Sequence, residues 1–175
     1  MNIAPNSIIE KGASIGDNTN VWYFAHVREN AKIGNNCNVG NYCYIDKDVV
    51  IGDDCRIANG VSIYQGTIIK DRVFIGNNVT FTNVRRPSAS RKAERFLYTV
   101  IEDDVTIDAG AHIVGGVKIG KGAKIAAGAV VISNIESFAF VAGNPAESPE
   151  VKRKKLFSLI NKIFQGNNTQ QIYGE

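Results

Sequence analysis

Aliphatic or aromatic residues recur at every sixth position of the chain. The series begins at Ile9, continues without a miss to Phe81, and resumes from Ile101 to Val131. A small or β-branched residue stands two places before almost every member. A period of six fits no helix, because the apolar face of a helix recurs every three to four residues. We therefore predict that each hexad forms a short strand followed by a turn.

Cysteine and glycine occupy fixed places in this pattern. Cys37, Cys43 and Cys55 all stand at the small position, and they lack metal-ligand spacing such as C-x-x-C. We interpret them as inward-facing packing residues. Glycine often follows the recurring apolar residue directly, at Gly16, Gly34, Gly40, Gly52 and Gly76. Because glycine tolerates positive φ, we expect these glycines to form the corners between strands.

Hexads of this kind resemble the repeat of the hexapeptide-repeat acyltransferases, which fold as left-handed parallel β-helices. The handedness is implied by the resemblance, since the general rule for parallel crossovers favours the right-handed form. Three hexads complete one triangular coil in that family, which implies an all-β prism of about six coils. We expect this β-helix acyltransferase domain over residues 1–147.

The rhythm is interrupted once. The step from Phe81 to Ile101 is 20 residues, which is not a multiple of six. We predict that a loop over residues 83–99 leaves the prism and returns to it. In the resembling enzymes three prisms assemble around a threefold axis, so such a loop would reach over the cleft between neighbouring subunits.

A different pattern follows the repeats, and it predicts a C-terminal helix and tail over residues 148–175. Ser148 suits a helix N-cap and Pro149 the first helical position. An apolar stripe follows at Leu156, Leu159, Ile160 and Ile163. Gly166 is expected to end the helix.

Composition narrows the class of protein. A chain of 175 residues that is 44% hydrophobic suffices for one domain with a core. A net charge of +3 is too small to indicate nucleic-acid binding. No apolar run approaches the roughly 18 residues of a membrane span, and the first residues lack a signal-peptide pattern. We expect a cytoplasmic protein.

Residues that are three hexads apart stack when a coil takes three hexads, and this stacking rule predicts one unusually polar face. One column of that face holds His26, Tyr44, Ser62 and Thr80, and the next holds Arg28, Asp46, Tyr64 and Thr82. The predicted loop leaves the prism where this face reaches Asn83. His112 occupies an outward position that we expect at the surface or in an interface.

Four stretches carry a narrower resemblance: "VWYFAHVRENAKIG", "NGVSIY", "FTNV" with the residues that follow it, and "AGNPAE". They are similar to bacterial N-acetyltransferases that modify nucleotide-linked 3-amino sugars for surface polysaccharide such as lipopolysaccharide. The resemblance covers about residues 5–147. It implies acetyl-CoA as donor, no metal, and a homotrimer with active sites between subunits. Relatives often have His in place of Tyr23, and they usually end soon after the "NPA" stretch.

The same resemblance places Asn83 beside the sugar amine. Its amide cannot act as a base, but its oxygen can accept a hydrogen bond from the amine and orient the lone pair. An alcohol would need a strong base, normally His, and the loop contains none, which favours an amine acceptor. His26 is the second catalytic candidate, although it could equally contact substrate or lie in an interface.

Substrate and cofactor contacts are predicted on the same basis. Arg28 either grips a diphosphate or pairs with Glu29 or Asp46, and Tyr44 and Tyr64 either stack on the ligand or pack between subunits. Asp46 and Thr82 complete the substrate set. The Gly- and Ala-rich late coils leave a channel for pantetheine, with predicted coenzyme contacts at Ala109, Gly115, Lys121, Ala127, Pro145, Lys152 and Arg153. Each of these lysines could instead be a solvated surface charge.

Other functions stay open at this point. A γ-class carbonic anhydrase has a related fold but needs three His around zinc, and the chain has two His. A non-catalytic β-helix scaffold remains an alternative, because the repeat alone says nothing of catalysis. A 4-amino nucleotide sugar, or another small amine or alcohol, is the alternative acceptor.

Overall fold

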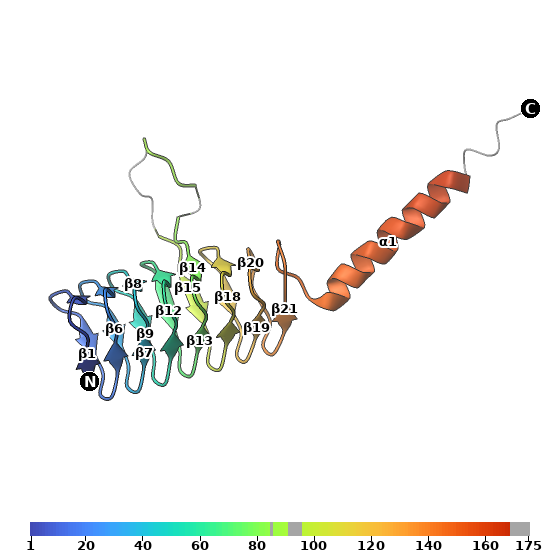
Figure 1. The fold of residues 1–175 in the computed structure, drawn as a ribbon. Coiled ribbons are helices and arrows are strands. Elements are labelled where there is room, and N and C mark those ends of the chain that lie inside the picture. The colour runs from blue at the N-terminus through green and yellow to red at the C-terminus, as the bar shows by residue number, and fades with distance from the viewer. Residues whose placement is uncertain (85, 91–95, 169–175) are drawn as a thin grey trace, which may run out of the picture.

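The chain forms a triangular prism of three parallel sheets, a left-handed parallel β-helix with one C-terminal helix (Figure 1). The computed structural model describes residues 1–84, 86–90 and 96–168, with side chains inside the helix as far as Lys162. Within these residues no helix carries an apolar stretch long enough to cross a bilayer.

Each sheet is a ladder of short strands that pair in parallel. Sheet A consists of β1 (Asn2–Ile3), β4 (Asn20–Val21), β7 (Asn38–Val39), β10 (Arg56–Ile57), β13 (Phe74–Ile75), β16 (Thr106–Ile107), β19 (Lys124–Ile125) and β21 (Phe140–Val141). Sheet B consists of β2 (Ile8–Ile9), β5 (His26–Val27), β8 (Tyr44–Ile45), β11 (Ser62–Ile63), β14 (Thr80–Phe81), β17 (His112–Ile113) and β20 (Val130–Val131). Sheet C consists of β3 (Ser14–Ile15), β6 (Lys32–Ile33), β9 (Val50–Ile51), β12 (Thr67–Ile69), β15 (Thr99–Ile101) and β18 (Lys118–Ile119).

The prism has about seven coils rather than the six expected, since the described sheets hold eight, seven and six strands. The additional strands lie at the two ends. Ile3 extends the rhythm one hexad before Ile9. Val141 pairs with Ile125 although it lies outside the six-residue period.

The recurring apolar residues fill the interior of the prism, as predicted. Partners in neighbouring coils are three hexads apart in the sequence, as in the pair of His26 with Tyr44. Cys37, Cys43 and Cys55 are buried with exposures of 1% or less, which confirms them as packing residues. The core is therefore a stack of repeated apolar layers from Val21 to Val141, with Ile9 and Ile15 partly buried at the N-terminal end.

These glycines lie at the corners between strands, as expected, but the predicted conformational reason is wrong. Gly16 and its equivalents lack positive φ, which falls two residues later, for example at Asn18 with φ of 56°. Asn and Asp accept this conformation because their short polar side chains can hydrogen-bond locally. Gly16 has a different reason: a Cβ there would lie 2.5 Å from the carbonyl carbon of Gly34 in the next coil. Close approach of neighbouring coils, rather than backbone conformation, requires these glycines.

The chain leaves the prism after β14 and returns at β15, in the region of the predicted loop (Figure 1). Ser62 pairs with Thr80 at the regular step of three hexads, whereas the next partner of Thr80 is His112. The coil between Thr80 and His112 is therefore lengthened by an insertion. The N–H of Leu97 donates to the carbonyl oxygen of Asn83 at 2.9 Å. This hydrogen bond closes the base of the excursion, the segment between Asn83 and Leu97. Residues 85 and 91–95 of the predicted loop lie outside the described residues.

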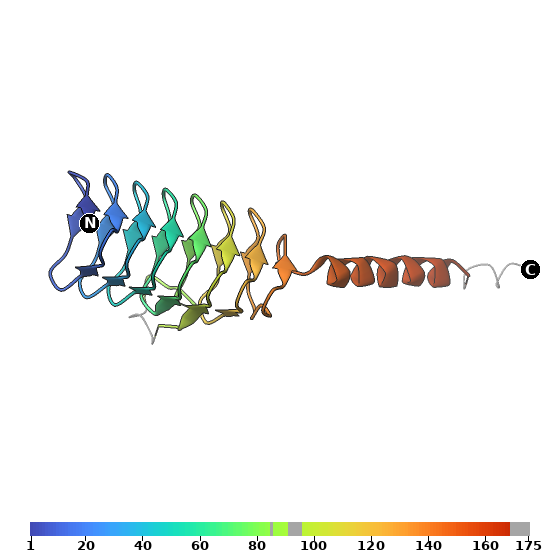
Figure 2. The same cartoon turned by 90° about the horizontal axis from the view of Figure 1, so that it is seen from below.

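Helix α1 (Pro149–Asn168) extends away from the C-terminal end of the prism (Figures 1 and 2). The N–H of Val151 donates to Ser148 Oγ at 3.4 Å, in agreement with the predicted N-cap. The predicted end at Gly166 is wrong, because the helix continues to Asn168. The tail at 169–175 lies outside the described residues.

Candidate functional site

Asn83 is held at the point where the chain leaves the prism, at the corner between sheets B and C. Its side chain is half-buried, and Nδ2 donates to the carbonyl oxygen of Gln65 at 3.0 Å. A carbonyl oxygen can only accept, so this contact fixes the orientation of the Asn83 amide. Oδ1 is then the atom of Asn83 that can accept a hydrogen bond from a ligand.

Gly115 supports this arrangement from the next coil. Its N–H donates to Thr82 Oγ1 at 3.1 Å. A Cβ on Gly115 would lie 2.6 Å from the carbonyl oxygen of Thr82 and 3.0 Å from Asn83 Cα. Gly115, a predicted coenzyme contact, therefore also allows the backbone at Asn83 to sit closely on the following coil.

A hollow of about 400 Å³ opens beside the base of the excursion. It is lined by Leu97, Gly115, Gly116, Val117, Ile132, Ser133 and Asn134. Leu97 and Gly115 belong both to this wall and to the contacts around Asn83. The hollow has room for a narrow chain of atoms next to the polar amide.

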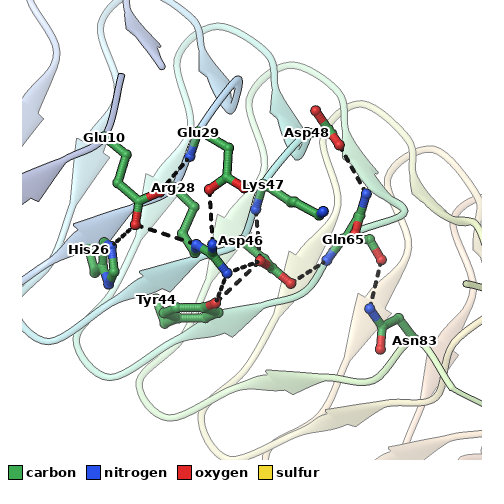
Figure 3. A network of polar contacts seen from close by, with 10 residues as sticks. All are labelled: Glu10, His26, Arg28, Glu29, Tyr44, Asp46, Lys47, Asp48, Gln65 and Asn83. Carbon is green, nitrogen blue, oxygen red and sulfur yellow. Dashed lines mark hydrogen bonds and ion pairs between the residues drawn. The ribbon is translucent and has the colours of Figure 1, made fainter. Parts of the chain in front are cut away.

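Arg28 lies at the centre of a polar network on the face that the stacking rule predicts (Figure 3). Its guanidinium nitrogens lie 3.4 Å from Glu10, 3.0 Å from Glu29 and 3.5 Å from Asp46. A hydrogen bond to the Tyr44 hydroxyl, together with the acidic neighbours, raises the pKa of Arg28. Arg28 therefore makes the ion pairs with Glu29 and Asp46, and a diphosphate would have to compete with three carboxylates for it.

His26 is paired with Glu10, a residue that the sequence analysis did not single out. His26 Nε2 lies 2.6 Å from Glu10 Oε1. Hydrogen bonds from Glu29 and His26 lower the pKa of Glu10 to about 2. Glu10 stands one coil before Arg28 in the same column, so the stacking rule applied one coil earlier would have found it.

The structure does not bring the two catalytic candidates together within one chain. His26 on β5 and Thr80 on β14 are three strands apart in sheet B, or about 14 Å at the usual strand spacing. Hydrogen bonds bridge part of this distance, because the N–H of Gln65 donates to Asp46 at 3.2 Å and its carbonyl accepts from Asn83 (Figure 3). One chain therefore cannot hold one small group against both side chains.

His112 lies nearer to the excursion than His26 does. It is exposed and pairs with Thr80 in the adjacent strand, so it continues the column of His26 past the insertion. The inserted residues hide this position from the stacking rule. The longer sequence step that brings His112 beside Thr80 becomes visible only in the paired strands of the sheet.

Aromatic side chains line the same face. The rings of His26 and Tyr44 meet edge to face with centroids 5.7 Å apart, and Tyr44 and Tyr64 are also 5.7 Å apart. Tyr64 and Thr82 are exposed. These side chains offer a surface on which a planar ring could stack.

The predicted coenzyme contacts lie on different corners of the prism. Ala109 and Ala127 follow strands of sheet A, Gly115 follows sheet B, and Lys121 follows sheet C. Lys121 lies 3.7 Å from Asp104. Pro145 is exposed beyond β21, and Lys152 and Arg153 are exposed on α1. A single chain does not gather these residues around one ligand.

Comparison with known families gives a match over most of the repeats. Residues 12–47, 30–65, 48–83 and 98–133 match the family described as "Bacterial transferase hexapeptide (six repeats)". These stretches together cover more than half of the chain.

Individual relatives match over smaller shares. Over 70 residues, 37% of the chain, it is 43% identical to 2,3,4,5-tetrahydropyridine-2,6-dicarboxylate N-acetyltransferase from Staphylococcus aureus, and it spans 29% of that relative's length. The structure of the hexapeptide-repeat acetyltransferase VCA0836 from Vibrio cholerae, complexed with acetyl-CoA, is similar with a TM-score of 0.58 and 28% identity, covering 79% of this chain and 69% of that one. The acetyltransferase domain of PglB from Neisseria gonorrhoeae shares the fold, with a TM-score of 0.57 and 23% identity over 83% of this chain and 56% of that one.

Proposed function

The chain belongs to the bacterial transferase hexapeptide family, and from that premise we propose that it is an acetyl-CoA-dependent N-acetyltransferase acting on a nucleotide-linked 3-amino sugar. The observation that carries the proposal is the fixed amide of Asn83 beside the hollow. The hollow would receive the end of the acetyl donor, and Oδ1 would receive the amine.

The reaction needs positioning more than acid or base chemistry. The neutral amine attacks the thioester carbonyl carbon, forming a C–N bond and a tetrahedral oxyanion. Collapse of this intermediate breaks the C–S bond and expels the CoA thiolate, and the proton lost from nitrogen passes to the thiolate or to water. Asn83 Oδ1 accepts a hydrogen bond from the amine and aims its lone pair at the carbonyl.

The donor is proposed to lie along the hollow lined by Leu97, Gly116 and Ile132. Glycine backbone and apolar side chains suit the pantetheine arm of acetyl-CoA, and the similar structure from Vibrio cholerae is complexed with acetyl-CoA. The other proposed coenzyme contacts lie on separate corners, which is consistent with a homotrimer in which two chains contribute to each site.

The nucleotide sugar is proposed to extend over the polar face. Tyr44 and Tyr64 would stack on its rings, while Thr82 and Asp46 offer hydrogen-bonding oxygens. The nucleoside can be uridine or thymidine. We place the enzyme in the cytoplasm, with its product destined for surface polysaccharide.

A screen of acceptors tests the proposal. The protein would be incubated with acetyl-CoA and a panel of uridine- and thymidine-linked 3-amino and 4-amino sugars, together with tetrahydrodipicolinate, and thiol release would be followed. We expect the highest kcat/KM with a 3-amino nucleotide sugar. Preference for a 4-amino sugar or for the non-sugar acceptor would overturn the substrate class, and no thiol release with any acceptor would favour a scaffold.

A further inference from the structure

Most side chains of helix α1 face solvent, although Lys155 reaches back to Glu147 at the end of the prism. Every residue described from Pro149 to Lys162 is exposed. The exposures include large apolar groups: 58% for Leu156, 65% for Phe157 and 57% for Leu159. Figures 1 and 2 both show the helix projecting beyond the last coil. Within the described residues, such a helix leaves an apolar surface without a partner in the chain.

Between Lys154 and Lys162 the exposed side chains separate into two faces. At 3.6 residues per turn, Leu156, Phe157, Leu159 and Ile160 fall within an arc of about 160°. Lys154, Lys155, Ser158, Asn161 and Lys162 occupy the opposite side. This stretch of the helix is therefore amphipathic, with lysines on its polar face.

The charge of the helix is strongly one-sided. Pro149–Asn168 contains five basic residues, Lys152, Arg153, Lys154, Lys155 and Lys162, and one acidic residue, Glu150. Lys155 pairs with Glu147 at the end of the prism. The excess of positive charge on the helix suits an anionic partner.

We propose that α1 binds the surface of an anionic phospholipid membrane, lying along the interface between headgroups and acyl chains. An exposed helix with Leu and Phe on one face and Lys on the other has the composition of such interfacial helices. The apolar face would enter the acyl boundary, and the lysines would meet lipid phosphates. The prism would then be held at the membrane by its C-terminal end.

A second copy of the chain would fit the apolar face of α1 less well than a membrane surface does. Lys152 and Arg153 lie within the angular range of the apolar arc, one turn earlier. Packing identical helices by this face would bring these like charges together, and Glu150 alone cannot pair with them. At a membrane their long stems can follow the apolar surface while the charged ends reach the phosphates.

The test is co-flotation of the full-length protein with vesicles of phosphatidylcholine, alone or mixed with phosphatidylglycerol, at low and high salt. We expect binding to anionic vesicles that weakens with salt. Lys154→Gln combined with Lys162→Gln should weaken it about fivefold for each charge removed. Phe157→Ser combined with Ile160→Ser should abolish it, whereas Asn161→Ser, a matched change on the polar face, should retain it.

Circular dichroism and light scattering of the same variants keep the outcomes distinct. The proposal is overturned if the wild-type protein does not float, or floats equally well with neutral vesicles. It is also overturned if Phe157→Ser with Ile160→Ser changes the oligomeric state and the wild-type protein shows no vesicle binding, which would assign the face to a second copy. The rate of thiol release without vesicles should be unchanged in Phe157→Ser with Ile160→Ser. The test of membrane binding is therefore independent of the proposed enzyme activity.

Discussion

Replacing Asn83 by Ala removes two different contacts, and their magnitudes can be separated. The hydrogen bond to the carbonyl of Gln65 is a neutral contact at a half-buried site, so its loss should cost about 1 kcal/mol of folding stability. For a chain of 175 residues this corresponds to a fall in Tm of roughly 2–4 °C. Loss of the oriented acceptor for the amine should lower kcat by about 10- to 1,000-fold, the range for a positioning contact rather than a nucleophile.

Asn35→Ala is the matched control. Asn35 Oδ1 accepts a hydrogen bond from the N–H of Asp17 at 2.8 Å, a neutral contact between neighbouring coils that is remote from the excursion. Both variants should show similar small losses of Tm, but only Asn83→Ala should lose turnover. Full activity in Asn83→Ala, or an equal loss in Asn35→Ala, would refute the assigned role.

The histidines provide the second arm of the same assay. His26→Ala and His112→Ala should each cost less than Asn83→Ala, because the proposed reaction needs no histidine base. Thiol release would be measured against pH with a 3-amino nucleotide sugar. A pH dependence in the range where histidine titrates, removed by either substitution, would move the chemistry to that histidine.

Four further outcomes follow from particular contacts. The depressed pKa of Glu10 stabilises the fold above pH 4.5 and loses this effect as pH falls through about 2, so Glu10→Gln should differ most from wild type at neutral pH. Urea midpoints at several pH values measure this, and a pH-independent difference would contradict it. Burial raises the pKa of the Cys43 thiol to about 11, so a thiol reagent should label the native protein slowly and the unfolded protein rapidly; fast native labelling with loss of activity would reverse that assignment. Gly115→Ala would press a methyl group against the Thr82 carbonyl, so turnover and Tm should both fall, and an unchanged Tm would show that the coils can separate there. Light scattering should give a mass of about three times 19.0 kDa, as a trimer requires. An active monomer would contradict the proposal that two chains share each site.

Much of the fold could be predicted from the sequence because each hexad repeats the same local requirement. In each hexad the apolar residue and the small residue two places earlier both face the interior of the prism. Periodicity alone therefore predicts the strands, the core residues and the stacking of the hexads. The buried cysteines follow from this rule, and so do the columns that bring Arg28 beside Asp46. The departure of the chain at Asn83 is likewise visible, since an insertion breaks the period.

Contacts between coils depended on the tertiary structure. The glycines after the apolar residues are required by backbone approach across coils, which no local conformational preference records. The pairing of His26 with Glu10 depends on how side chains of neighbouring coils are oriented, and the position of His112 beside Thr80 depends on register across the inserted residues. The sequence by itself determined which residues face inward, because burial repeats with the period. Only the folded prism decided which polar side chains meet and that α1 projects beyond the last coil, because these depend on how separate coils and elements are placed in space.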